Sequence, residues 1–210
     1  MRLHGHPRSL ATWRVRIALA LKNLLVEMVE HDTAARDVTP ASLLQINPQG
    51  QVPVLETDSG QRLTQSLAII EWLDEMWPTP PLLPPGPVLR ARVRAFSHAI
   101  ATDLHPLVTD RALGRLRRLE MPEASLRHWT RSALAEGLDA CETLLTGAEG
   151  PFCFGSIPGL ADVCLVPQLA LARQYGMNLT FPRLLAAEAA CMTLPAFHST
   201  CPPELWSKSS

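Results

Sequence analysis

The chain has 210 residues, of which 47% are hydrophobic and 19% charged, and its formal net charge is -1. This balance is typical of a globular protein and excludes a disordered chain, and the small net charge gives no reason to expect nucleic acid or an anionic membrane as a partner. No apolar run reaches the length of a bilayer span, and the N-terminus lacks the apolar core of a signal peptide. We therefore expect a soluble, cytoplasmic protein.

The five cysteines lie at positions 141, 153, 164, 191 and 201, all in the second half of the chain. Their number is odd and no pair has the C-x-x-C spacing, which indicates neither a disulfide framework nor a zinc site. We expect buried free thiols and no metal.

Short strands and helices alternate over the first 77 residues in the order β-α-β-α-β-β-α. The first helix begins at a capping residue, Ser9 or Thr12, because either hydroxyl can accept from the backbone N–H groups of a first turn. The expected elements are a strand at 2–4, a helix to about Lys22, a strand at 25–31, a helix from Thr39-Pro40 to about Ile46, a hairpin with strands at 50–56 and from 63, and a helix from Gln65 to about Met76.

The hairpin carries the features on which the functional prediction depends. Its first strand is entered through Pro53, which cannot donate to the ladder and can follow a cis peptide bond. A cis bond would turn the backbone N–H and C=O groups of Val52 outward, where a short peptide ligand could pair with them. Gln65 and Ser66 stand where the next helix begins, so their N–H groups face any anion placed there. A peptide with a carboxylate would suit this surface, and an ordinary hairpin packed on a helix is the alternative.

Prolines crowd residues 78–87, which can form neither a helix nor a central strand, and we interpret this segment as a linker. After it the pattern is helical almost throughout, and Pro106 is expected to kink or interrupt the first helix. The expected helices span about 88–118, 123–146, 160–175 and 181–191, with a terminal segment around 194–206. The predicted domains are an α/β domain at 1–77, the linker at 78–87 and an all-helical domain at 88–210.

The element order of the first domain matches the thioredoxin-like fold. The predicted architecture is therefore an α/β N-terminal thioredoxin-like domain followed by an all-α C-terminal helical-bundle domain. Thioredoxins and glutaredoxins place a reactive cysteine at the start of the first helix, where the helix dipole stabilises a thiolate. Here that turn reads Arg8-Ser9-Leu10-Ala11-Thr12 and has no cysteine. If thiolate chemistry takes place, the thiol must arrive on a ligand.

With this two-domain plan, the chain resembles a glutathione S-transferase in two stretches of its first domain. They are Asn47-Pro48-Gln49-Gly50-Gln51-Val52-Pro53-Val54-Leu55 and Leu63-Thr64-Gln65-Ser66. The chain is most similar to the zeta class, which includes maleylacetoacetate and maleylpyruvate isomerases. The residues that carry this similarity are Trp13 to Lys22, Ala68 to Leu73, Asp103-Leu104-His105-Pro106 and Leu160 to Gln168. The resemblance covers nearly the whole chain.

The resemblance implies that the first domain binds glutathione, as a coenzyme or co-substrate. Val52, next to a cis Pro53, would pair with the cysteinyl backbone of glutathione. Gln65 and Ser66 would hold the γ-glutamyl carboxylate, and Gln49 would lie beside the glycyl end.

The resemblance also implies residues at the sulfur atom and a second subunit. Ser9 would hydrogen-bond the sulfur, and the helix start, Arg8 and Arg14 would add the positive potential that favours a thiolate. Asp103 and His105 would reach the glutathione of the neighbouring subunit in a homodimer. In the implied reaction the thiolate adds to the cis double bond of a maleyl diketo acid. Rotation and elimination then give the trans fumaryl product and return glutathione unchanged.

The chain departs from the zeta pattern at its signature, Ser-Ser-Cys, which reads Ser9-Leu10-Ala11 here. Thr12 is a reserve hydroxyl, and Leu10 makes the expected substrate cavity less polar. Val38 stands where the family often carries a histidine or lysine for the glycyl carboxylate. Ser9 itself has a simpler alternative role as a helix cap.

Besides Leu10, the residues expected to bind the substrate lie in the second domain. The family's arginine for a substrate carboxylate corresponds to Gln174, and Arg173 lies one residue, or about 100° of helical rotation, away from it. Arg111 is a further candidate to face the cleft.

Three functions remain open at this point. The first is a glutathione-dependent isomerase or transferase of zeta type acting on a small electrophile. The second is a general glutathione S-transferase that conjugates apolar electrophiles, which Leu10, Ala11 and Val38 favour. The third is a glutathione-binding or interaction protein without turnover, which the loss of two of the three signature residues suggests.

Overall fold

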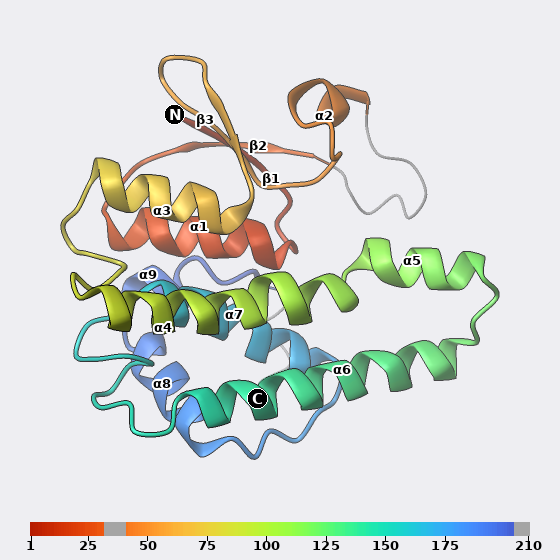
Figure 1. The fold of residues 1–210 in the computed structure, drawn as a ribbon. Helices are drawn as coiled ribbons and strands as arrows, with labels where there is room; N and C mark the ends of the chain where they lie inside the picture. Colours follow the sequence, from red (N-terminus) through yellow and green to blue (C-terminus); the bar gives the residue numbers. More distant parts are fainter. Residues whose placement is uncertain (32–40, 204–210) are drawn as a thin grey trace.

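The structure is a computed structural model that describes residues 1–31 and 41–203. A small sheet with its helices forms one end of the molecule, and a bundle of helices forms the other (Figure 1). The strands lie in the order β2-β1-β3-β4, with β1 parallel to β2, β1 antiparallel to β3, and β3 antiparallel to β4. Their bounds are Arg2–Gly5 for β1, Glu27–Glu30 for β2, Val54–Glu56 for β3 and Arg62–Thr64 for β4.

Three helices accompany the sheet: α1 (Leu10–Leu21), α2 (Ala41–Ile46) and α3 (Ser66–Met76). Helices α1 and α3 pack side by side between the sheet and the helical bundle, and the short α2 lies away from them (Figure 1). The order of elements, β-α-β-α-β-β-α, is the predicted one.

Apart from an isolated β-bridge between Phe152 and Gly155, the described part of the second half contains only helices, turns and loops. The bounds of the α-helices are Pro87–His98 for α4, Asp110–Arg118 for α5, Glu123–Leu144 for α6, Leu160–Gln174 for α7, Pro182–Met192 for α8 and Pro195–His198 for α9. Between α4 and α5 the chain forms a π-helical turn, Ala99–Leu104, and a 3₁₀ turn, His105–Leu107. The interruption expected at Pro106 is confirmed, since proline removes a backbone donor and its ring cannot fit a continuous helix.

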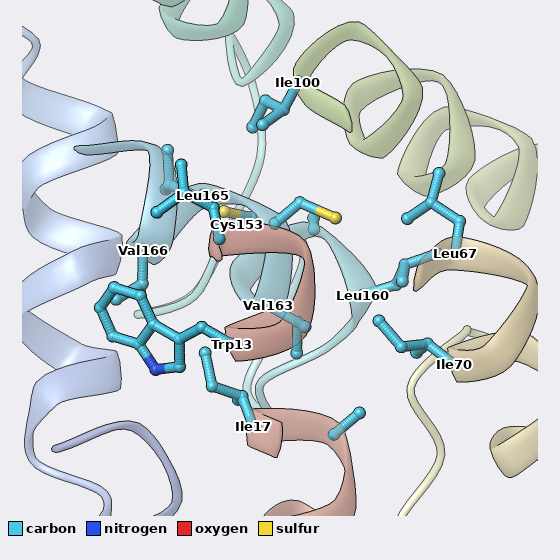
Figure 2. Close-up of a cluster of buried hydrophobic side chains, with 14 of the residues drawn as sticks. Trp13, Ile17, Leu67, Ile70, Ile100, Cys153, Leu160, Val163, Leu165 and Val166 are labelled. Carbon is cyan, nitrogen blue, oxygen red and sulfur yellow. The ribbon is translucent and has the colours of Figure 1, made fainter. Parts of the chain in front are cut away.

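One hydrophobic core joins the two halves. Helix α1 packs against α3 on one side and against α7 and α9 on others, so its apolar residues cover more than one face, as a buried helix requires. Figure 2 shows the ring of Trp13 beside Val166, with Leu165 close by on α7. The indole N–H of Trp13 donates to the hydroxyl of Thr200 at 3.1 Å, which satisfies its buried polar atom.

A buried lysine holds the proline-rich segment in place. The ammonium group of Lys22, whose side chain is fully buried, donates to Asp74 at 2.8 Å, to the carbonyl of Trp77 at 2.5 Å and to the carbonyl of Pro80 at 2.7 Å. Asp74 also accepts from the backbone N–H of Leu82 at 2.8 Å. All three ammonium donors are thus used, and the segment that joins α3 to α4 is tied to α1.

The structure differs from the sequence prediction mainly at element ends. Strand β3 begins at Val54 and not at residue 50, because residues 47–50 form a turn in which the N–H of Gly50 donates to the carbonyl of Asn47 at 2.8 Å. The terminal segment expected at 194–206 contains the short helix α9. The helix start expected at Thr39-Pro40 lies outside the described residues, and the domain boundaries at 77 and 88 stay predictions.

All five cysteines lie in the described part of the chain and none forms a disulfide. Four are buried, as expected, and Cys201 is half-buried. Within residues 1–31 and 41–203, no helix is long and apolar enough to cross a membrane.

Candidate functional site

Ser9 caps helix α1 and keeps a free donor. Its backbone is extended, and its Oγ accepts from the backbone N–H of Thr12 at 3.2 Å. A hydroxyl that accepts through a lone pair still has its own proton to donate. The two roles considered for Ser9, cap and donor to a sulfur, are therefore compatible. Of the two capping candidates, the structure places Ser9 at the cap position.

Thr12 is buried under the sheet end. Its side chain is 1% exposed, and its Oγ1 accepts from the backbone N–H of His6 at 3.4 Å. Its methyl group fills the space above Gly5, where a Cβ would lie only 2.4 Å from Thr12 Cγ2. The reserve hydroxyl is thus buried and accepts a hydrogen bond from the backbone of the turn before α1.

We expect Gly5→Ala to lower the free energy of unfolding by about 1–3 kcal/mol, because the added methyl collides with that of Thr12. Urea denaturation measures the effect. The double variant with Thr12→Ser removes the colliding methyl and is expected to recover at least half of the loss. A double variant no more stable than Gly5→Ala would show that this contact is not the cause.

The hairpin residues and the start of α3 form one surface. The Val52–Pro53 peptide bond is cis, and Val52 precedes Val54, the first paired residue of β3. Gln65 stands at the N-cap of α3 with a positive φ of 69° and an exposed side chain, and Ser66 opens the helix. Gln65 makes no side-chain cap, so the first N–H groups of α3 lack that partner and suit a carboxylate.

A turn and an arginine from the other half complete this surface. Asn47 organises the turn, since its side chain donates to the carbonyl of Gln51 at 2.8 Å and accepts from the N–H of Gln49 at 3.0 Å. The side-chain amide of Gln65 donates to that of Gln49 at 3.0 Å. Arg111, on α5, donates to the carbonyl of Gln49 at 2.9 Å. The predicted Gln49, Gln65 and Arg111 are thus brought together.

Arg14 is buried, and it is an electrostatic neighbour of His105, which is half-buried in the 3₁₀ turn. Arg14 is 1% exposed, and neither its Nε nor its Nη2 has a hydrogen-bond partner among the described residues. Burial, and then the nearby Arg14 guanidinium, lower the pKa of His105 to about 3. His105 is therefore neutral at pH 7.

This pKa predicts a loss of stability in acid. An unfolded histidine titrates near pH 6.5, so below that pH the unfolded state binds a proton that folded His105 does not. Stability is expected to fall as the pH drops from about 6.5 towards 3, by at most about 1.4 kcal/mol per pH unit from this group. Urea denaturation at pH 7 and at pH 5 measures the free energy of unfolding at each pH. The His105→Gln variant should show a smaller difference between the two values than the wild type. If the stability of His105→Gln depends on pH as that of the wild type does, His105 is not the source of the loss in acid.

The other predicted residues differ in their burial and in their contacts. The guanidinium of Arg173 forms a two-point ion pair with Glu188 on α8, so substrate binding by Arg173 would have to break that pair. Gln174 and Asp103 are exposed. Leu10 is 4% exposed and belongs to the core.

The remaining predictions concern Arg8, Val38 and a metal. Arg8 is exposed, with its N–H donated to the His6 ring at 3.2 Å. Val38 lies outside the described residues. Within these residues no group of three or more His, Cys, Asp or Glu side chains could hold a metal ion. Sequence reasoning missed the role of Asn47, although an asparagine before a proline is a known turn signal.

The comparisons with known proteins agree with this geometry. A family model described as glutathione S-transferase, N-terminal domain, matches residues 8–76, and one described as glutathione S-transferase, C-terminal domain, matches residues 61–188. The chain belongs to the glutathione S-transferase family. This confirms the predicted family and the predicted fold class.

This glutathione S-transferase is similar to curated relatives over nearly its full length. It is 41% identical to a maleylacetoacetate isomerase of Pseudomonas aeruginosa, over 96% of each chain. It is 39% identical to a maleylpyruvate isomerase of a Ralstonia species, over 96% of this chain and 97% of the relative.

Two solved structures resemble this glutathione S-transferase closely. A holo maleyl pyruvate isomerase, described as a bacterial zeta-class enzyme, matches with a TM-score of 0.91 and 39% identity over 96% of this chain and 97% of that one. A maleylacetoacetate isomerase of Anaeromyxobacter dehalogenans with glutathione bound in its active site matches with a TM-score of 0.87 and 41% identity, over 96% and 94% of the two chains.

Proposed function

We propose that this glutathione S-transferase is a cis–trans isomerase that uses glutathione as coenzyme and acts on a maleyl diketo acid, maleylacetoacetate or maleylpyruvate. The observation that carries the proposal is the surface at which the cis Val52–Pro53 bond, Gln49 and the open start of α3 at Gln65 meet. The free donor of Ser9 stands at the start of α1, and the cap at Gln65 leaves the start of α3 open. The names of the relatives support the choice of substrate.

In this proposal each residue of the surface binds a different part of glutathione. Gln65 and Ser66, with the N–H groups at the start of α3, hold the γ-glutamyl carboxylate. The backbone of Val52 pairs with the cysteinyl unit, and Gln49 lies by the glycyl end. Ser9 donates its proton to the sulfur, so that a thiolate is stabilised against a thiol. Bound glutathione supplies the nucleophile that adds to the double bond and leaves after rotation.

Arg111 is the better placed of the candidates for a substrate carboxylate. It already lies at Gln49, on the edge of the proposed glutathione site, and its bond there is to a neutral carbonyl. Arg173 is held by a carboxylate, a stronger partner than a carbonyl. We propose Arg111 as the substrate arginine, while Gln174 and Arg173 stay weaker candidates.

We propose further that the protein is a cytoplasmic homodimer. Large apolar side chains are exposed at the end of α3 and at the start of α4: Met76 is 56% exposed and Val88 74%. Such side chains are common at subunit interfaces. The exposed Asp103 would reach the glutathione of the second subunit. Analytical ultracentrifugation tests the oligomeric state, and a monomer at micromolar concentration would overturn this part.

A second function, conjugation of apolar electrophiles, is favoured by the loss of hydroxyl and thiol at Leu10 and Ala11. The rate with maleylpyruvate beside the rate with an aromatic halide separates the two. The isomerase proposal expects the maleyl acid to react at least about 10²-fold faster in kcat/KM. A preference for the halide would favour the conjugating enzyme. Retention on immobilised glutathione without turnover of either compound would favour a binding protein.

A further inference from the structure

Three residues at the start of α1 form a closed network of hydrogen bonds. The backbone N–H of His6 donates to Thr12 Oγ1 at 3.4 Å, and the N–H of Thr12 donates to Ser9 Oγ at 3.2 Å. The N–H of Ser9 closes the network, because it donates to the carbonyl of His6 at 3.0 Å. The place of the Ser9 hydroxyl therefore depends on the turn that begins at His6.

The bond between Ser9 and His6 makes residues 6–9 a β-turn, and the sequence suits this turn. Pro7 stands at its second position, where the fixed φ of proline is favourable. The N–H of Arg8, at the third position, is not part of the bond that closes the turn. The His6 imidazole accepts this N–H through Nδ1 at 3.2 Å. His6 thus holds the turn with its N–H, its carbonyl and its side chain.

The bond from Arg8 defines the state of the His6 imidazole. A nitrogen that accepts an N–H carries no proton, so the neutral imidazole has its proton on Nε2. The donor and the acceptor are two residues apart in the chain. An asparagine side chain accepts the backbone N–H two residues on in the same way, as it does in Asx turns. Asparagine is therefore the conservative replacement for this role of His6.

Strand β1 holds the beginning of the turn. Gly5 is the last residue of β1 and is paired with Glu30 of β2. A Cβ on Gly5 would lie 2.4 Å from Thr12 Cγ2, so the strand ends in close contact with the first turn of α1. Because Gly5 leads directly into His6, the sheet fixes where the turn starts.

The turn leaves the sheet at the end where glutathione is proposed to bind. Val54 is paired with His4 of β1 and with Thr64 of β4. The turn follows β1 just beyond this row of paired residues. Val52 precedes the row on β3, and Gln65 follows it after β4. All three connections therefore lie at one end of the sheet.

We propose that His6 is a positioning residue, which fixes the turn from which Ser9 donates its proton to the glutathione sulfur. The inference rests on the proposed function and adds to it a residue that acts through Ser9. Without the imidazole, the N–H of Arg8 loses its acceptor and the turn gains conformational freedom. The hydroxyl of Ser9 is then less often in line with the sulfur, and such a loss of alignment slows a reaction.

The variants His6→Ala and His6→Asn test this by steady-state kinetics with maleylpyruvate and glutathione. Alanine removes the acceptor, and we expect kcat to fall about tenfold. The KM for glutathione should change less than about twofold, because the proposed contacts to its peptide lie on other residues. Asparagine keeps an acceptor and is expected to leave kcat within about twofold of the wild type. An unchanged kcat in His6→Ala, or equal losses in both variants, overturns the inference.

A double-mutant cycle with Ser9→Gly shows whether His6 acts through Ser9. When the Ser9 hydroxyl is absent, His6→Ala has nothing to misalign and should change kcat less than about twofold. A further loss of about tenfold in the Ser9→Gly background overturns the inference.

Thr57→Ala is the matched control for stability. Thr57 Oγ1 also accepts a backbone N–H within a turn, that of Gln61 at 3.1 Å, at the opposite end of the hairpin from Val52 and Gln65. We expect Thr57→Ala to lower the Tm about as much as His6→Ala does and to leave kcat unchanged. An equal fall of kcat in both variants would show a general effect of stability and overturn the inference.

The wild type separates this inference from the proposed function. If the wild type isomerises maleylpyruvate no faster than glutathione alone, the proposed function fails, and the inference fails with it. If the wild type is active and the variants depart from these results, only the inference fails. For a His6→Ala chain that does not fold, nitrogen NMR of the wild type with glutathione decides. A neutral His6 imidazole with its proton on Nδ1 overturns the inference, because that nitrogen cannot then accept from Arg8.

Discussion

Replacing Ser9 by glycine is expected to lower glutathione-dependent turnover by about 10²-fold while leaving the fold intact. The substitution removes the donor assigned to the sulfur. It retains most of the helix cap, since glycine at an N-cap costs only a few tenths of a kcal/mol relative to serine. Steady-state kinetics with maleylpyruvate measures the loss, and thermal unfolding checks the fold.

Two further variants separate the hydroxyl from the cap. Ser9→Ala removes both and is expected to lose the same activity, with an added loss of about 1 kcal/mol of stability. Thr109→Ala removes the matching cap of α5, where Thr109 accepts from the N–H of Ala112 at 3.1 Å. It should cost similar stability, which measures what a side-chain cap contributes in this protein. Activity of Ser9→Gly within about threefold of the wild type would reduce Ser9 to a cap.

Replacing Lys22 by methionine is expected to lower the free energy of unfolding by about 3–5 kcal/mol. The ammonium group is fully buried and bonded to Asp74, Trp77 and Pro80. Removal of the cation leaves a largely buried carboxylate without its partner, and two carbonyls lose their donor. Urea denaturation measures the change.

Arg90 provides the control for this second prediction. It also bonds two carbonyls of the proline-rich segment, those of Pro84 and Pro85, at 2.9 and 3.1 Å, but it lies nearer the solvent. Arg90→Met is therefore expected to cost less than about 1 kcal/mol. Equal losses in the two variants would mean that burial of the ion pair at Lys22 contributes nothing of its own.

Local patterns predicted much of the fold because the deciding interactions are local. The alternation of short strands and helices, the break at Pro106 and the helix start at Gln65-Ser66 all follow from residues within one or two turns. The choice between Ser9 and Thr12 as cap needed the structure, because both side chains can cap a helix. The identity of the ligand came from the hairpin and the family resemblance together.

Long-range pairings could not be read from spacing. Arg173 and Glu188 lie on different helices, so the pattern of α7 alone gave no sign of their ion pair. The full burial of Arg14 was not predicted either, since arginine is mostly exposed in proteins. Its burial depends on how α1 packs against the second half of the chain.

The most direct test of the proposed function is a proton NMR time course of maleylpyruvate with enzyme and glutathione at about one hundredth of the substrate concentration. The account predicts complete conversion to the fumaryl isomer with glutathione unchanged at the end, so that each glutathione serves about 10² turnovers. Conversion that stops at one equivalent of glutathione, or that runs no faster than with glutathione alone, would contradict it.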